Sequence, residues 1–247
     1  RNRQMCKKKL VGFIFLICLF FLSGCSTMHS WFFSKPKDTA QEIFQAGEKA
    51  MQEEDYTAAI DYFKKLKKKF PFSPYTVKGE LRLADAYFQE DRLMEAEKSY
   101  KDFESLHPGH EKIPYVLFRI GLCNFKRFRA IDLPLTDTKE ALQYFQRVKQ
   151  SYPTSEYAKK AVDYIEKCKL YLARHEIYVA NFYWNTEKYA AAWKRYQSVM
   201  QKYEDMETLY NYAKKRSKMA YLKLQESLAA EKRREKQGSW KDWFEWL

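Results

Sequence analysis

Glycine and proline are scarce in this sequence, with seven of each among 247 residues. Sheet-rich folds use these residues in their many tight turns, so their scarcity argues against such a fold. Charged residues make up 31% of the chain and aromatic residues 17%. This balance suits helices that pack against one another through large aromatic side chains. We therefore predict an all-α protein.

Sequence signatures of catalysis are also missing. The chain has no glycine-rich loop to cradle a phosphate, no pair of histidines spaced to bind a metal on one helix face, and no nucleophile elbow. His107 and His110 flank a proline and a glycine that mark a turn, and Cys123 has no histidine partner in an identifiable arrangement. We therefore expect no enzymatic activity, no metal site and no cofactor.

One residue spacing recurs four times along the chain. An alanine is followed by two large apolar residues and then by a proline, which the fourth copy replaces with glutamate. The copies are Ala59, Phe63, Leu66 and Pro71; Ala96, Tyr100, Phe103 and Pro108; Ala141, Phe145, Val148 and Pro153; and Ala192, Tyr196, Val199 and Glu204. The first three positions share one helical face, and a proline stops the helix. Upstream, Gly47 and Ala84 are small enough for a partner helix to approach closely.

A helical hairpin of about 34 residues with these features is typical of the tetratricopeptide repeat. Each hairpin buries its apolar stripe only against its neighbours. We therefore predict a right-handed superhelical solenoid of about five repeats over residues 39–235, with a concave groove. An irregular helical bundle with coincidental spacing is the alternative.

Three irregularities are expected within the solenoid. The third repeat carries a loop insertion at 129–134, between its two helices. The fourth repeat shows no helix breaker until about Asn185, so its first helix should run for roughly 30 residues and join the front repeats to the rear ones. A last helix from Glu207 to about Arg234 should close the array with a polar outer face.

The start of the chain has the features of an exported lipoprotein. Basic residues precede an apolar run of thirteen residues, Leu10 to Leu22, which is too short to span a bilayer comfortably. The next residues end in Cys25 and resemble a bacterial lipobox, which implies cleavage before Cys25 and lipidation of its thiol. We predict a signal peptide at 1–24 and a lipidated tether at 25–38. An ordinary signal peptide with an incidental cysteine is the alternative.

The residues after the cysteine bear on location and partners. Ser26 and Thr27 are not acidic, which for bacterial lipoproteins usually implies sorting to the outer membrane, where acyl chains would hold the protein at the periplasmic face. Removing the five basic residues of the signal lowers the formal net charge from +13 to +8. Because an exported protein rarely meets nucleic acid, anionic lipid head groups or an acidic protein surface are the expected partners.

Two aromatic segments each allow two interpretations. Residues 31–33, Trp-Phe-Phe, would either lie at the lipid head groups or pack on the first helix. The tail at 236–247 would be either a short amphipathic helix or a disordered end. Its apolar residues are Trp240, Trp243, Phe244 and Leu247.

Cys123 and Cys168 remain once the signal and the lipid anchor are set aside. An oxidising periplasm would permit a disulfide between them, but both lie inside helical patterns. We favour two buried small hydrophobic residues.

Several stretches of the chain carry linked motifs: Phe70–Tyr75, Leu106–His110 with Tyr115–Val116 and Gly121–Leu122, Tyr152–Tyr157, and Leu172–Glu176 with Val179–Ala180. Together they resemble the BamD family of outer-membrane assembly lipoproteins. The resemblance runs from the lipobox to about Tyr203 and includes the insertion in the third repeat. It implies a five-repeat lipoprotein that binds the periplasmic domains of the barrel-forming assembly protein through its rear repeats. It also implies that the front groove receives unfolded outer-membrane proteins, and that other assembly lipoproteins are partners.

The resemblance further implies two binding sites. In the family, an arginine on the second helix of the fourth repeat meets an acidic residue of the barrel protein, and this arginine matches Arg195. The groove-facing residues of the first two repeats are expected at Phe44, Glu48, Met51, Leu81, Asp85 and Phe88. They mix apolar and acidic side chains, as suits an extended peptide with aromatic residues, although several would alternatively be inter-helix core.

The chain also departs from the family pattern. Glu204 and Asp205 replace the usual proline after the fourth repeat, and the tryptophan-rich tail is not a family hallmark. The competing functions are a structural lipoprotein that ties cell-wall or division machinery to the outer membrane, and a pilus or secretion pilot. Both would share the lipid anchor and the solenoid.

Overall fold

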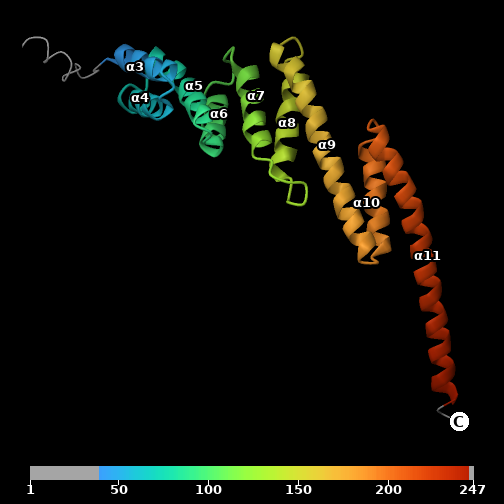
Figure 1. Ribbon diagram of the computed structural model, residues 1–247. Coiled ribbons are helices and arrows are strands. Elements are labelled where there is room, and N and C mark those ends of the chain that lie inside the picture. Colours follow the sequence, from blue (N-terminus) through green and yellow to red (C-terminus); the bar gives the residue numbers. More distant parts are fainter. Residues whose placement is uncertain (1–38, 245–247) are drawn as a thin grey trace, which may run out of the picture.

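The computed structural model describes the backbone of residues 39–244 and the side chains of residues 39–237. Every regular element in this part of the chain is an α-helix, and successive helices pair into hairpins along a curved array (Figure 1). The helices are α3 (Ala40–Gln52), α4 (Tyr56–Lys69), α5 (Pro74–Gln89), α6 (Leu93–Leu106), α7 (Ile113–Lys126), α8 (Thr136–Ser151), α9 (Glu156–Asn185), α10 (Tyr189–Lys202) and α11 (Glu207–Phe244). The predicted all-α solenoid is confirmed. Within these described residues, no helix is both long and apolar enough to serve as a membrane span.

The turns inside three of the hairpins share one backbone conformation. Each has three residues between its helices, and the middle residue has a positive φ: 59° at Glu54, 56° at Asp91 and 59° at Glu187. At the first turn, the Asp55 side chain then caps α4 by accepting from the backbone N–H of Ala58 at 2.9 Å. Because the three turns have the same length, the second helix of each pair starts in the same register against the first.

The second helices of the four repeats also end alike. In each, the residue after the helix donates its backbone N–H to the carbonyl four positions earlier. These residues are Phe70, His107, Tyr152 and Tyr203. Tyr203 does so although Glu204 follows it, whereas a proline follows the other three. The fourth repeat therefore ends its helix without the proline.

Close helix contacts form where the repeat pattern places its small residues. Gly47 is buried on α3, and a Cβ atom built there would lie 2.5 Å from the Phe63 ring of α4. Gly121 on α7 has the same relation to Phe145 on α8, at 2.6 Å. The alanine of every copy is fully buried. The predicted close approach at Gly47 is confirmed.

The long helix α9 joins two separate hydrophobic cores. The front core extends from α3 to the first half of α9 and includes Ile165 and Cys168. The rear core begins at Ala180 on the same helix and continues through α10 to Ala213 and Ala220 of α11. Figure 1 shows α9 running from α8 to α10 without interruption. The predicted 30-residue helix and its connecting role are both confirmed.

The last helix is longer than predicted. It runs from Glu207 to Phe244, whereas the sequence predicted an end near Arg234. No proline interrupts residues 234–244, and Gly238 costs a helix interior only about 1 kcal/mol relative to alanine, so nothing in the local sequence stops the helix. Cys25, the aromatic residues at 31–33 and the tail side chains from Trp240 onward lie outside the described residues.

Candidate functional sites

An ion-paired row joins the first helices of the first two repeats, where the sequence predicts the front groove. Glu48 on α3 accepts two hydrogen bonds from the guanidinium of Arg82 on α5, at 2.7 and 2.6 Å. Arg82 also lies 3.6 Å from the carboxylate of Asp85. Arg82 is therefore held between two acids, and this bidentate pairing raises its pKa.

Asp85 continues this row into the third repeat through two tyrosines. The residue is 7% exposed, and its carboxylate accepts hydrogen bonds from the hydroxyls of Tyr100 on α6 and Tyr115 on α7. Arg119 on α7 donates its Nε–H to the Tyr100 hydroxyl at 2.9 Å, and its guanidinium stacks 3.5 Å from the centre of the Phe88 ring. Burial, followed by the Asp85 charge, raises the pKa of both tyrosines, so both remain protonated donors.

The six groove residues predicted from sequence fall into two groups. Glu48, Asp85 and Phe88 lie in the row just described. Phe88 is 9% exposed and belongs to the front core, so it also serves inter-helix packing. Phe44, Met51 and Leu81 are partly buried against the front core, and Phe44 contacts the rings of Phe63 and Tyr75. The second group therefore matches the alternative interpretation, in which such residues serve mainly as inter-helix packing.

Sequence reasoning missed Arg82 and Arg119, the two bases of the row. The spacing of Arg82 contains a usable signal, because it lies 34 residues after Glu48, which is one repeat length. Opposite charges one repeat apart can meet across neighbouring first helices. Arg119 gives no comparable signal, since it contacts its partners through a tyrosine hydroxyl and a ring face.

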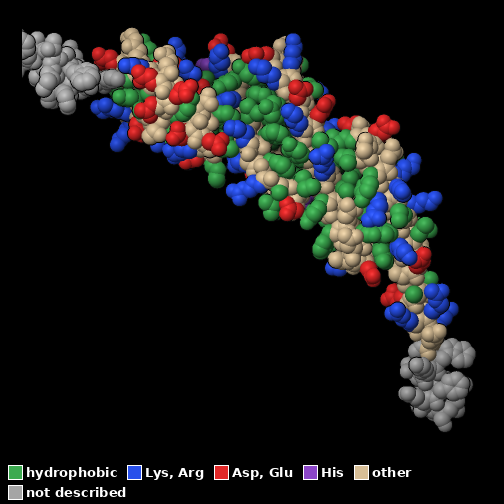
Figure 2. Space-filling view, in the orientation of Figure 1, with side chains coloured by type: hydrophobic (Ala, Val, Ile, Leu, Met, Phe, Trp, Pro, Cys, Tyr) green, Lys and Arg blue, Asp and Glu red, His purple; other side chains and the backbone are tan. Residues whose placement is uncertain are grey.

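A continuous set of aromatic contacts extends from this row across α7 and α9. Tyr115 meets Tyr157 with ring centres 5.4 Å apart, and further contacts follow along both helices. They include Phe118 with Tyr157 and Tyr164, and Tyr171 with Phe125 and Phe128. Figure 2 shows hydrophobic side chains gathered over α7, α8 and α9 in the middle of the array. The third repeat thus presents aromatic faces next to the charged row.

Arg195 lies on α10, in the second helix of the fourth repeat as predicted. Its side chain is 44% exposed and donates to the Glu176 carboxylate on α9 at 2.9 Å. Glu176 is more enclosed, at 18% exposure. A partner carboxylate would therefore find part of the guanidinium accessible while the other part is already paired.

Cys123 and Cys168 are free thiols, buried in α7 and α9. Burial raises the pKa of each thiol to about 12. The interpretation as buried small residues is confirmed, and the disulfide alternative is wrong.

The predicted histidine turn joins neighbouring repeats. The ring of His107 lies 2.8 Å from the Glu80 carboxylate of α5, and His110 accepts from the backbone N–H of Lys112 at 3.1 Å. In the part of the chain that the structure describes, no group of three or more histidine, cysteine or acidic residues is arranged to hold a metal ion. Both imidazoles contact the Phe103 ring, with ring centres 4.9 and 5.2 Å apart, so they pack within the turn.

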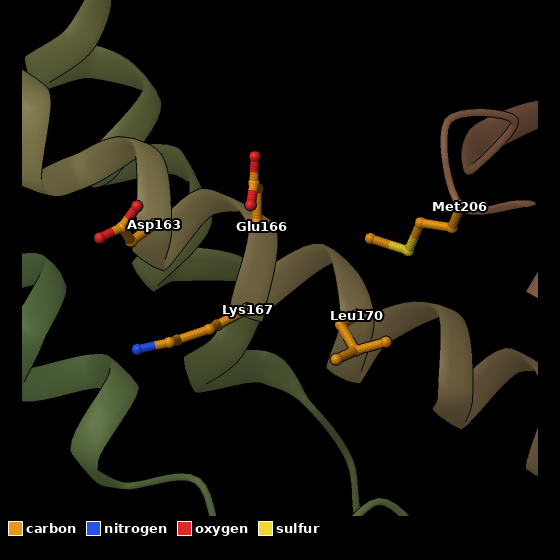
Figure 3. A pocket seen from close by; sticks show the side chains of 5 residues that line it. All are labelled: Asp163, Glu166, Lys167, Leu170 and Met206. Carbon is orange, nitrogen blue, oxygen red and sulfur yellow. The ribbon is translucent and has the colours of Figure 1, made fainter.

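A shallow hollow of about 410 Å³ opens on α9 beside the turn that precedes α11. It is lined by Asp163, Glu166, Lys167, Leu170 and Met206. In Figure 3, Met206 reaches from that turn toward α9. None of the residues predicted as binding sites lines this hollow, so it is separate from both the front groove and Arg195.

Comparison with protein families decides the family. The model for the family described as "YfiO: Outer membrane lipoprotein" matches residues 36–236. The chain belongs to the YfiO family of outer membrane lipoproteins. The resemblance drawn from the sequence is thereby confirmed.

Individual relatives agree with the YfiO assignment. The chain is 28% identical over 202 residues to a Vibrio cholerae protein named outer membrane protein assembly factor BamD, covering 78% of this chain and 83% of the relative. It is also 28% identical over 214 residues to the BamD of Pasteurella multocida, covering 82% and 81%. Among solved structures, the TPR2AB domain of yeast Sti1 aligns with a TM-score of 0.46 and 16% identity, over 75% of this chain and 70% of that one.

Proposed function

We propose that this protein is a lipoprotein subunit of the machinery that folds and inserts β-barrel proteins into the outer membrane. The observation that carries the proposal is the extent of the family match, because residues 36–236 include every hairpin of the solenoid. The Vibrio cholerae and Pasteurella multocida relatives align over more than four fifths of their own length, which supports a shared role rather than a shared repeat alone. In this role the protein scaffolds and binds, and catalyses no reaction.

The front groove is proposed to receive unfolded outer-membrane proteins. An extended segment needs apolar surfaces for alternate side chains and polar groups for its backbone. The partly exposed rings of Tyr115 and Tyr157 supply aromatic surface, while Glu48 and Arg82 supply paired charges that can exchange partners with a bound peptide. The groove thus recognises polar and aromatic character rather than one fixed sequence, as suits a subunit with many clients.

The rear repeats are proposed to bind the periplasmic domains of the barrel-forming assembly protein through Arg195. Its accessible guanidinium suits a bidentate contact with a partner carboxylate. The Cys25 lipid anchor would hold the solenoid at the periplasmic face of the outer membrane, close to that partner and to other assembly lipoproteins.

Affinity purification in parallel with depletion tests the proposal. A tagged chain is purified from envelopes solubilised in a mild detergent, and the same gene is depleted in cells. We expect an outer-membrane barrel protein with periplasmic domains to co-purify, and the levels of several barrel proteins to fall together on depletion. Unchanged barrel proteins, together with co-purification of cell-wall or division proteins, would contradict the proposal and favour a structural scaffold.

A further inference from the structure

Five side chains form the same contact arrangement twice in this chain. The front copy joins α5, α6 and α7, and the rear copy joins α9, α10 and α11. The front residues are Asp85, Phe88, Tyr100, Tyr115 and Arg119, and the rear residues are Asn181, Trp184, Tyr196, Tyr212 and Arg216. Each rear residue follows its front counterpart by 96 or 97 positions. Two distant hairpin junctions therefore use one design.

The rear geometry reproduces the front geometry contact by contact. The side-chain oxygen of Asn181 accepts hydrogen bonds from the hydroxyls of Tyr196 and Tyr212, the latter at 3.0 Å. Arg216 donates its Nε–H to the Tyr196 hydroxyl at 3.2 Å, and its guanidinium lies 4.3 Å from the centre of a Trp184 ring. The tyrosine rings meet edge to face at 6.4 Å, against 6.3 Å in the front copy.

The two copies differ at the position that carries charge. In the front copy Asp85 is an acid, and with Glu48 it balances the two bases Arg82 and Arg119. In the rear copy this position is Asn181, which is neutral. Arg216 forms no ion pair with any residue that the structure describes. The rear copy therefore retains one uncompensated positive charge.

Several N–H groups of the Arg216 guanidinium also have no acceptor among the described residues. Arginine has five N–H groups in one plane, and the structure engages only its Nε–H in a hydrogen bond to a described residue. Arg216 is partly exposed and lies over the Trp184 ring, so its remaining N–H groups are available to a ligand. A partly desolvated cation with an open fork is suited to a carboxylate.

Exposed apolar side chains continue on both sides of this arginine. Along α11, Tyr212 precedes Arg216 by four residues and Met219 follows it by three, so the three share one helix face. Their exposures are 41% for Tyr212 and 39% for Met219. On α9, Tyr178 is 46% exposed and stands one turn before Asn181, at the position equivalent to Arg82 of the front row.

We propose that this rear network is a second peptide-binding site, which takes an aspartate or glutamate side chain within an extended apolar segment of a partner protein. Because apolar surface flanks Arg216 in both directions, the bound segment continues past the carboxylate, which favours a side chain over a chain end. The site is distinct from Arg195. The proposal does not depend on which partner Arg195 binds.

Side-chain NMR of the purified full-length protein in detergent tests the site. The Nε–Hε signal of Arg216 is assigned by its loss in Arg216→Lys and followed during titration to about 5 mM with N-acetyl-leucyl-glutamyl-tyrosine amide. The same peptide with glutamine in place of glutamate is the matched ligand. We expect the glutamate peptide to shift the Arg216 signal and the glutamine peptide to bind at least about tenfold more weakly, which is the scale of one charge-assisted hydrogen bond. The Nε–Hε signal of Arg92, which is paired with Glu95 outside both networks, serves as an internal control and should not move.

A single substitution converts the rear copy to the front design. Asn181→Asp should fold, because the front copy accommodates the same set with Asp85, and it should weaken binding of the glutamate peptide. No shift of the Arg216 signal with the glutamate peptide, or equal shifts with both peptides, would overturn the proposal. Tighter binding of the glutamine peptide with a free C-terminal carboxylate would overturn the assignment to a side chain.

Discussion

Arg195 on α10 and Glu176 on α9 form a salt bridge across the fourth repeat, at 2.9 Å. The residue proposed to bind an acidic partner therefore already has an acid within its own chain. The pair is unequal, because the arginine side chain is 44% exposed and the glutamate 18%. A partner carboxylate would share the guanidinium with Glu176 or displace it, and this competition makes the interface testable from both sides.

For this interface, we predict opposite outcomes at the two residues. Arg195→Gln should weaken binding to the isolated periplasmic domains of the barrel-forming protein by about 30-fold or more, since losing one member of an interfacial charge pair costs on the order of 2–5 kcal/mol. Glu176→Gln should leave binding unchanged or tighten it. Both variants should melt within about 4 °C of the native protein, because an exposed salt bridge contributes at most about 1 kcal/mol. Calorimetric titration measures the binding, and native affinity in Arg195→Gln would place the interface elsewhere.

The helix contact at Gly47 predicts a large cost for one methyl group. Gly47→Ala places a Cβ atom 2.5 Å from the buried Phe63 ring, which cannot move away without disturbing the front core. We expect a loss of about 1–3 kcal/mol in the free energy of unfolding. Gly109→Ala is the matched control, because a Cβ atom there meets nothing within 4 Å. Urea titrations of the two variants should differ clearly, and equal midpoints would mean that the first hairpin is loosely packed.

The buried carboxylate of the front row predicts a graded response. Asp85→Ala leaves the hydroxyls of Tyr100 and Tyr115 without their acceptor, at a cost of about 2–4 kcal/mol in the free energy of unfolding. Asp85→Asn keeps an acceptor oxygen and should cost less than about 1 kcal/mol, as the rear copy with Asn181 suggests. Chemical denaturation ranks the two variants. If both are equally stable, the tyrosine hydrogen bonds contribute nothing to folding.

The two buried thiols should be chemically inert. Their burial should also make the free energy of unfolding depend on pH in the alkaline range. Burial raises the pKa of Cys123 and Cys168 to about 12, so near neutral pH neither supplies the reactive thiolate. The folded chain keeps these protons above the ordinary thiol pKa, whereas the unfolded chain releases them. This contribution to stability is therefore complete below about pH 8.5 and declines as the pH rises toward 12. A thiol reagent at pH 8 should label Cys123 and Cys168 only after denaturation, and rapid native labelling would contradict their burial.

Much of the fold could be predicted because each repeat carries its main packing residues within its own stretch of sequence. The alanine, aromatic and proline positions located each second helix, and the absence of a breaker located α9. The end of α11 was predicted too early, because the sequence has no stop signal near Arg234 and residues 231–237 are exposed, so packing does not mark where the helix ends.

The candidate sites were only partly predictable for a related reason. Glu48 and Asp85 could be proposed from their places on first helices, but Glu48 pairs with Arg82 of the second repeat and Asp85 with Tyr115 of the third. Tyr100 was identified from sequence as a core residue, and only the structure shows its hydroxyl joining Asp85 to Arg119. The rear copy was missed in the sequence because Asn181 is uncharged and lies inside a long helix, where no residue pattern distinguishes it.

The unbroken course of α9 has a consequence for how the two ends of the protein work together. Thirty residues at 1.5 Å each give a rod of about 45 Å, and both cores are attached to it. One residue inserted between Cys168 and Ala180 would turn everything beyond it by about 100°, without removing a single side chain from either core. The number of residues in α9 therefore sets the angle between a client in the front groove and a partner on the rear repeats.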